Sequence, residues 1–73
     1  MQKIDFPISE DYIELIKLLK AIGLAQTGGH AKMIVDDGLV SRNGEIEKRK
    51  RAKLVSGDKL TIDNQIEIKI ITT

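Results

Sequence analysis

The spacing of the apolar residues changes at Gly38, and this change most restricts the folds open to the chain. Upstream of Gly38, apolar side chains recur at steps of three and four, as they do on one face of a helix. Downstream they alternate with polar side chains, as in half-buried strands. A chain that changes from one period to the other is expected to be α+β, with a helix pair packed on a small antiparallel sheet.

Two helices are expected before Gly38. The first begins near Glu10, after an N-cap at Ser9, and ends at Gly23. Its apolar stripe consists of Tyr12, Leu15, Ile16, Leu19 and Ile22. The second begins after an N-cap at Thr27, and its stripe consists of Ala31, Ile34 and Val35. Because the connection between them is short, the two helices must pack on each other as a helix-turn-helix-like unit.

Strands are expected on both sides of the helix pair. Residues 3–8 fit a short edge strand, because Pro7 cannot donate a hydrogen bond to a neighbour. Asn43-Gly44 stands between two strand-like runs and predicts a tight hairpin. The antiparallel meander is expected to continue through residues 54–55, 60–62 and 66–71.

Composition excludes several classes of protein. The 73 residues suffice for one small domain, residues 1–73, and they include no cysteine and one histidine. Disulfides, thiolate ligands and a histidine zinc cluster are therefore excluded, and we expect no metal or other cofactor. No acid pair or activated serine stands in a catalytic context, so we expect neither an enzyme nor a small-molecule substrate. The absence of a long apolar run predicts a cytoplasmic protein without membrane contact.

Basic charge is concentrated in one short segment. The chain has a net charge of +1, but residues 1–14 carry one lysine against four acids and residues 39–62 carry seven cations against three acids. Most of the cations lie at Lys48, Arg49, Lys50, Arg51 and Lys53. Such a run is either a solvated loop or a clamp for a phosphate backbone, and its confinement to one segment favours the clamp. An extended backbone would send alternate cations to opposite faces.

The start of the second helix is a candidate anion site. Thr27, Gly28, Gly29, His30 and Lys32 combine free N–H groups, glycines that permit close approach, and a cation. The alternative is that the glycines only close a turn between packed helices. The spacing of a phosphate-binding loop of nucleotide hydrolases is absent.

A longer pattern joins these segments. It consists of Leu18, Leu19, Ile22, Gly23, Leu24, Ala25, Thr27, Ala31, Lys32, Ile34, Val35, Gly38, Val40, Asn43 and Gly44, followed by Val55, Gly57 and Asp58. In its order and spacing it resembles the ribosomal-protein S-four type RNA-binding domain, also called the alpha-L motif, over about residues 14–62. The segment from Thr27 to Lys32 and the basic run resemble the small stand-alone bacterial branch of that family. The resemblance implies binding of RNA, usually structured RNA, by the second helix and the loop between strands.

By position, the resemblance assigns RNA contacts to the start of the second helix and to the hairpin. The residues concerned are Thr27, Gly28, Gly29, His30, Lys32, Arg42 and Asn43, and the basic run extends the surface. Typical members have an arginine and an aspartate near the start of the first helix and an arginine after the threonine. Here these positions hold Glu14, Ile16 and Gly28.

We therefore expect a non-catalytic, monomeric module that binds structured RNA, possible targets being ribosomal or transfer RNA. A DNA reader with the second helix in the major groove is an alternative, although Ala31, Ile34 and Val35 are poor readers of base edges. A third alternative is a protein-interaction module that docks on an acidic partner in a ribosomal or RNA-processing assembly. With only Tyr12 and Phe6 as aromatics, a stacking platform for single strands is not expected.

Overall fold

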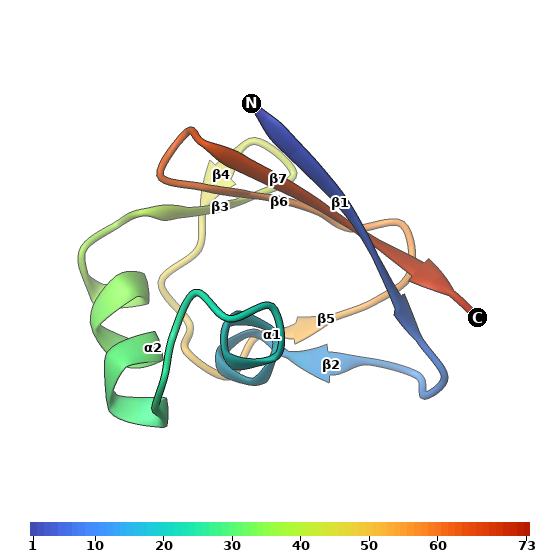
Figure 1. Cartoon of the computed structure of the whole chain (residues 1–73), viewed down its shortest axis with the longest axis horizontal. Helices are drawn as coiled ribbons and strands as arrows, with labels where there is room; N and C mark the ends of the chain where they lie inside the picture. The colour runs from blue at the N-terminus through green and yellow to red at the C-terminus, as the bar shows by residue number, and fades with distance from the viewer.

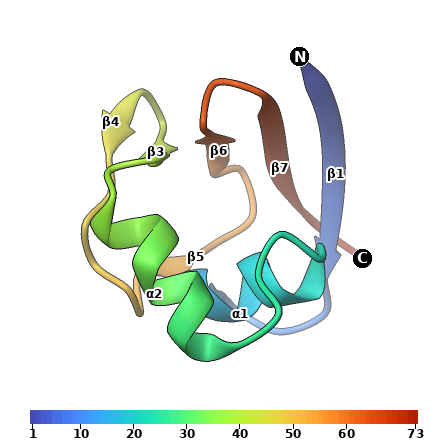
Figure 2. The ribbon, with the colours of Figure 1, turned by 60° about the vertical axis from the view of Figure 1, so that its left-hand side comes forward.

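A computed structural model describes all residues, 1–73. Its largest element is a five-stranded sheet in which the strands run in the order β1-β7-β6-β3-β4 (Figure 1). The strands are β1 (Gln2–Ile8), β3 (Val40–Arg42), β4 (Glu45–Ile46), β6 (Lys59–Ile62) and β7 (Ile66–Thr72). Two helices, α1 (Leu15–Ala21) and α2 (Gly28–Asp36), lie on one side of this sheet (Figure 2). The α+β class and the helix pair expected from the sequence are confirmed.

The sheet is mixed, which differs in one respect from the expected antiparallel arrangement. The pairs β3–β4, β3–β6 and β6–β7 are antiparallel, but β1 pairs with β7 in parallel. A parallel pair needs a crossover connection, and here the helices and all the other strands lie between β1 and β7 in the sequence. The expected strand over residues 3–8 is present and lies at the edge of the sheet.

The first helix begins later than the sequence predicts. Residues Ile13–Glu14 form a short strand, β2, which pairs with β5 (Lys53–Leu54) in a separate two-stranded sheet. The helix then starts at Leu15, with Glu14 as its N-cap, and not near Glu10 after Ser9. The same pairing removes β5 from the expected meander. Both predictions were wrong because strand pairing between distant segments prevailed over local capping signals.

Turn and cap positions follow the sequence closely. Asn43 and Gly44 have φ values of 52° and 92°, the left-handed pair that a tight hairpin requires. Thr27 caps α2, because its hydroxyl accepts the His30 N–H at 3.0 Å. The α1 helix ends just before Gly23, as expected. No helix of the molecule is both long enough and apolar enough to span a membrane.

The core is aliphatic, as the composition predicts. Its side chains come from both helices and from the inner face of the large sheet. Those that are fully buried and largest are Leu15, Leu18, Leu19, Val35, Val40, Leu54, Leu60, Ile68 and Ile70. In β7 the isoleucines at alternate positions point into this core, while Glu67 and Lys69 lie on the other face.

Candidate nucleic-acid interface

The basic run, residues Lys48–Lys53, connects β4 to β5, and we call it the basic loop. Its backbone is held against the start of α1: the Leu15 N–H donates to the Ala52 carbonyl at 3.0 Å, and the Ile16 N–H donates to the Lys50 carbonyl at 3.2 Å. Ala52 is buried in the core. These contacts satisfy N–H groups that have no partner within a helix, so the loop and the helix fix each other.

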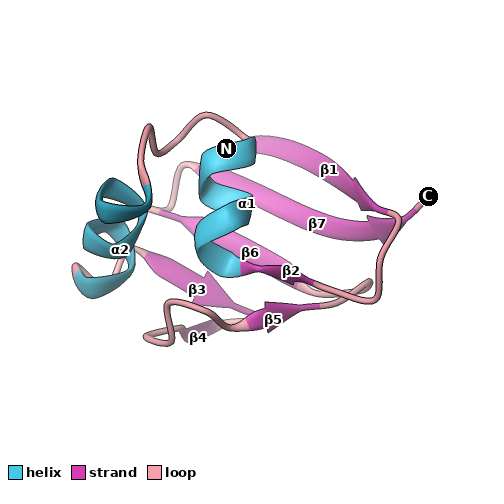
Figure 3. Ribbon diagram, turned by 90° about the horizontal axis from the view of Figure 1, so that it is seen from below, coloured by secondary structure: helices cyan, strands magenta, loops and turns pink.

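The cations of the basic loop separate into two groups. Arg49, Arg51 and Lys53 line one hollow together with Arg42 of β3 and the buried Ala52. We call it the cationic hollow. Lys50 instead pairs with Asp36 of α2, and Lys48 lies beside Gly38, just after that helix. In Figure 3 the loop between β4 and β5 passes near the end of α2 that leads into β3. The backbone of the basic loop is not extended: it turns at Lys50 and Arg51, where the Ala52 N–H donates to the Arg49 carbonyl at 3.2 Å.

Two contacts define the position of the second group. The Lys50 ammonium lies 3.2 Å from the Asp36 carboxylate in the last turn of α2. The Lys48 ammonium lies 3.6 Å from the point that a Cβ atom on Gly38 would occupy. The five cations therefore do not share one surface, and only three of them line the cationic hollow.

Arg42 is bound within the protein. Its Nη2 donates to Asp58 Oδ2 at 2.7 Å and to the Lys53 carbonyl at 2.9 Å, and its Nη1 donates to Glu47 Oε1 at 3.5 Å. The side chain is about one fifth exposed, at 21%. Arg42 therefore ties β3 to the end of the basic loop, and its charge is largely compensated by two carboxylates.

Asp58 joins the hairpin to the turn that precedes β6. Its carboxylate accepts the Val55 N–H at 2.9 Å and Asn43 Nδ2 at 3.1 Å, in addition to Arg42. Burial alone would raise the pKa of Asp58, but the hydrogen bonds from Val55, Asn43 and Arg42 outweigh it and lower the pKa below its ordinary value. Asn43 also accepts the Lys59 N–H at 3.0 Å. The side chains of Arg42 and Asn43 thus form an internal network around Asp58.

Glu47 holds a second arginine of this region, Arg49. Its Oε2 accepts the Nε and the backbone N–H of Arg49, both at 3.2 Å, and its Oε1 accepts Arg49 Nη2 at 3.2 Å. The hydrogen bonds from the Arg49 side chain lower the pKa of Glu47, and they prevail over burial, which acts in the opposite direction. The carboxylate in turn raises the pKa of Arg49.

Arg51 and Lys53 are the cations of the hollow without a carboxylate partner. Arg51 is exposed and forms no ion pair within the chain. The Lys53 ammonium lies 5.0 Å from the centre of the Tyr12 ring, a cation–π distance. Both charges therefore remain available to an anion from outside.

The start of α2 lies apart from the basic loop. Thr27 and His30 cap the helix locally, since the His30 ring accepts the Gln26 N–H at 3.3 Å and the His30 N–H donates to Thr27. In Figure 3 the basic loop lies near the end of α2 that leads into β3, and the start of the helix is turned away from it. Lys32 is exposed on α2 and has no ion pair. The sequence predicted one continuous surface, and the structure separates it into three parts.

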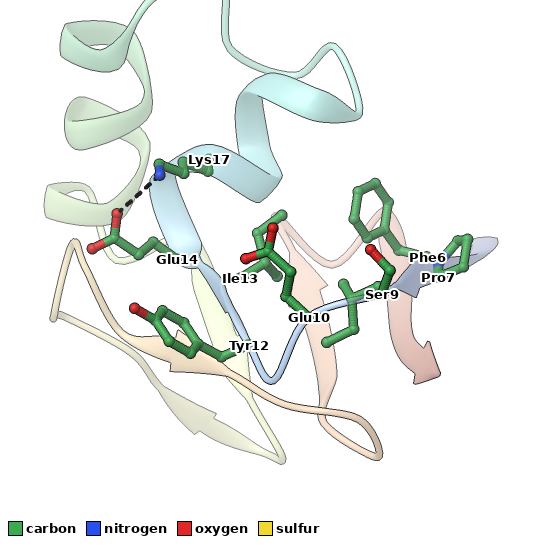
Figure 4. Close-up of a pocket in the computed structure, with 9 residues that line it drawn as sticks. Phe6, Pro7, Ser9, Glu10, Tyr12, Ile13, Glu14 and Lys17 are labelled. Atoms are coloured by element: carbon green, nitrogen blue, oxygen red, sulfur yellow. Dashed lines mark ion pairs between the residues drawn. The ribbon is translucent and has the colours of Figure 1, made fainter. Parts of the chain in front are cut away.

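A different hollow lies at the acidic N-terminal segment. Figure 4 shows its walls between the end of β1 and the start of α1. Phe6, Pro7, Ile13 and Tyr12 supply its apolar and aromatic surface, and Glu10 and Glu14 supply carboxylates, of which Glu14 lies 3.8 Å from the Lys17 ammonium. We call this the acidic hollow.

Sequence reasoning missed the two carboxylates that organise the cationic hollow. Glu47 and Asp58 are the buried polar residues of the chain, with 8% and 7% of their surface exposed. Asp58 belongs to the sequence pattern that carries the family resemblance, but that pattern does not indicate its role as an acceptor. A lone acid at the edge of a basic run, such as Glu47, is the signal that could have indicated an internal partner for an arginine.

Comparisons with known proteins bear on the family and the fold of the chain. A family model described as "S4 domain" matches residues 6–71. "Putative RNA-binding protein YbcJ" of Escherichia coli (strain K12) is 41% identical over 46 residues, which cover 63% of this chain and 66% of that protein. "Uncharacterized protein YbcJ" of Shigella flexneri matches to the same extent. The chain thus aligns with slightly less than two thirds of the length of these relatives.

A solved structure resembles the whole fold. The solution structure of YbcJ from E. coli, described as revealing an αL motif involved in RNA-binding, superposes with a TM-score of 0.69 at 29% sequence identity. The match covers 92% of this chain and 85% of that one. The helix pair, the hairpin and the Gly57-Asp58 turn are the elements on which the resemblance of the sequence rested. The chain belongs to the S4 domain family.

Proposed function

We propose that this chain is a non-catalytic RNA-binding module that holds the phosphate backbone of structured RNA in the cationic hollow. The observation that carries the proposal is the convergence of Arg49, Arg51 and Lys53 on one hollow beside Arg42. Two of these cations, Arg51 and Lys53, have no carboxylate partner within the protein, so their charges can be met by an external anion. The relatives described as RNA-binding support RNA as that anion.

The chemistry of the hollow suits phosphate groups. Arginine presents a planar fork of N–H groups that matches two phosphate oxygens, while lysine acts as a point charge. The loop backbone is fixed by the hydrogen bonds to Leu15 and Ile16, so little backbone order has to be gained on binding. Arg42 contributes mainly by holding the hollow together, because its own hydrogen bonds are made within the protein.

The predicted RNA contacts outside the cationic hollow depend on the path of the RNA. Lys48, Lys50 and Lys32 would meet phosphates only if the RNA reaches around the basic loop to α2. The N–H groups at Thr27, Gly28, Gly29 and His30 would meet one only if the RNA bends around α2. Tyr12 already faces Lys53 and Phe6 is half-buried, so the chain offers no free aromatic pair for stacking. This supports structured RNA over single strands. A monomeric state and a cytoplasmic location complete the proposal.

The test compares two variants that each lose one positive charge. Arg51→Gln removes an unpaired cation from the hollow, and Lys3→Gln removes one from β1, at the opposite edge of the sheet from β3 and β4. Fluorescence anisotropy with a labelled RNA stem-loop at one fixed salt concentration should show affinity lowered about tenfold by R51Q and hardly changed by K3Q. Equal losses for both variants would mean that only net charge matters, and would refute the assignment of the hollow.

The same experiment with duplex DNA as competitor tests the alternative that the protein is a helix-turn-helix DNA binder. Ala31 and Val35 are fully buried, and the exposed side chains of α2 include Met33 and Asp36 as well as Lys32. A face with one lysine, one aspartate and a methionine has no net positive charge, and it is a poor fit to the major groove. We expect duplex DNA of the same length to compete more weakly than the stem-loop, and a preference for DNA would reverse this ranking.

The acidic hollow favours a second candidate function, docking of a basic protein segment. Its apolar walls and its two glutamates would suit an apolar side chain flanked by lysine or arginine. A pull-down with immobilised wild-type protein should then retain a partner after ribonuclease treatment, and Glu10→Lys should lose it. A partner that disappears with the RNA would leave RNA binding as the sole function.

A further inference from the structure

Glu47 stands where a site for a polyanion should have no negative charge. It follows β4 directly and precedes the basic loop, and its side chain is 10% exposed. Its carboxylate lies between two arginines, with Arg49 Nε at 3.2 Å and Arg42 Nη1 at 3.5 Å. Arg49 itself is 75% exposed. The buried Glu47 carboxylate therefore binds one edge of the Arg49 guanidinium, while most of the Arg49 side chain remains exposed to solvent.

The geometry of this pair fixes the direction of Arg49. Nε and Nη2 donate side by side to the two carboxylate oxygens, and the backbone N–H of Arg49 donates to one of them as well. A paired contact of this kind sets the plane of the guanidinium as well as its position. The other guanidinium N–H groups of Arg49 make no hydrogen bond within the protein, and Arg49 lines the cationic hollow.

We propose that Glu47 is a positioning residue, which raises the affinity for RNA by holding the Arg49 guanidinium ready for a phosphate. The inference rests on the proposed function. A free arginine must lose the mobility of a long side chain when it binds a phosphate, whereas here that loss has already occurred in the free protein. The gain opposes the Coulomb repulsion between the carboxylate and the phosphate, which is weakened because Arg42 and Arg49 both compensate the carboxylate.

The direction in which a substitution at Glu47 changes the affinity for RNA distinguishes positioning from simple electrostatics. Glu47→Gln removes one negative charge at nearly constant shape, so electrostatics alone predicts tighter RNA binding. Positioning predicts weaker binding, by threefold or more. The matched control is Glu45→Gln, since Glu45 is exposed on β4, lines the neighbouring hollow with Glu47 and forms no ion pair. We expect E45Q to bind the stem-loop as tightly as the wild type or slightly more tightly.

A double-mutant cycle separates positioning from loss of structure. Arg49→Lys keeps the charge but cannot form the paired contact with Glu47. We expect R49K alone to weaken binding at least as much as E47Q, because lysine also lacks the fork that meets the phosphate, and we expect E47Q to cause no further loss in the R49K background. A general structural defect would instead weaken binding in both backgrounds. R49K also keeps the inference testable if E47Q does not fold.

The outcomes for the two proposals differ. If the wild type does not bind the stem-loop, the proposed function fails and the role of Glu47 fails with it. If the wild type binds but E47Q binds as tightly as E45Q, or R49K binds as tightly as the wild type, only the positioning role is overturned. Anisotropy titrations of all five proteins, with thermal melting as a check of folding, decide among these results.

Discussion

At the scale of single residues, Asp58 determines the structure around the candidate interface. It receives hydrogen bonds from the hairpin through Asn43, from β3 through Arg42 and from its own turn through the Val55 N–H. All of these donors would lose their acceptor at once if the carboxylate were removed. Leaving buried donors unpaired costs more than the hydrogen bonds themselves contribute.

Asp58→Asn should lower the free energy of unfolding by about 2–3 kcal/mol, because an amide replaces a charged acceptor at a site that is only 7% exposed. Urea denaturation at neutral pH measures the change. The control is Asp63→Asn, in an exposed turn where φ is 53°, a conformation that asparagine tolerates well. D63N should change stability by less than about 0.5 kcal/mol. Equal effects of the two substitutions would contradict the role of Asp58.

The same network makes stability depend on acid in a defined direction. Folding lowers the pKa of Asp58 and that of Glu47, so their contribution is present above the ordinary carboxylate pKa of about 4 and is lost as the pH falls through the lower folded values. The gap in stability between wild type and D58N should therefore be constant from pH 7 to about pH 5 and should narrow towards pH 3. Urea titrations at these pH values measure it. A gap that stays constant in acid would show that Asp58 acts without its charge.

At the scale of the elements, the sequence predicts turns and helix caps that depend on neighbouring residues, but it does not predict elements that depend on pairing between distant segments. The hairpin at Asn43-Gly44 and the cap at Thr27 depend on residues within three positions of each other, and both were predicted. The start of α1 was wrong because Ile13 and Glu14 pair with β5, some 40 residues away in the chain. The N–H groups of Leu15 and Ile16 then donate hydrogen bonds to carbonyls of the basic loop, and no local sequence pattern predicts these bonds.

Two glycine substitutions test the hairpin and the second helix with opposite signs. Gly44→Ala meets no steric obstacle but must hold φ at 92°, so it should destabilise the protein by about 1–2 kcal/mol. Gly28→Ala also has free space and lies in the first turn of α2 at an ordinary φ, so it should stabilise the protein by about 0.5–1 kcal/mol. Thermal or urea denaturation measures both. A stabilising G44A would contradict the hairpin geometry.

At the scale of the whole molecule, charge is arranged in separate parts. The acids of the N-terminal segment line one hollow, and the cations of the basic loop line another. Charge counts along the sequence predicted this asymmetry. They did not predict how many cations could act together, because that depends on which acids pair with them. Glu47 pairs with Arg49 nearby in the chain, whereas Asp36 pairs with Lys50 and Asp58 pairs with Arg42 across distant segments.

The salt dependence of RNA binding measures how many cations act together. If all five cations of the basic loop met phosphates, the slope of log affinity against log salt would be about −3.5 to −4.5, and three would give about −2 to −3. The structure brings only Arg49, Arg51 and Lys53 into one hollow, while Lys50 is paired with Asp36 beside α2. Anisotropy titrations at several salt concentrations should therefore give the smaller slope, and R51Q should reduce it by a little under one. A slope near −4 that Lys48→Gln and Lys50→Gln each reduce would instead mean that the RNA reaches around the loop to the end of α2, so that both groups of cations belong to one larger surface.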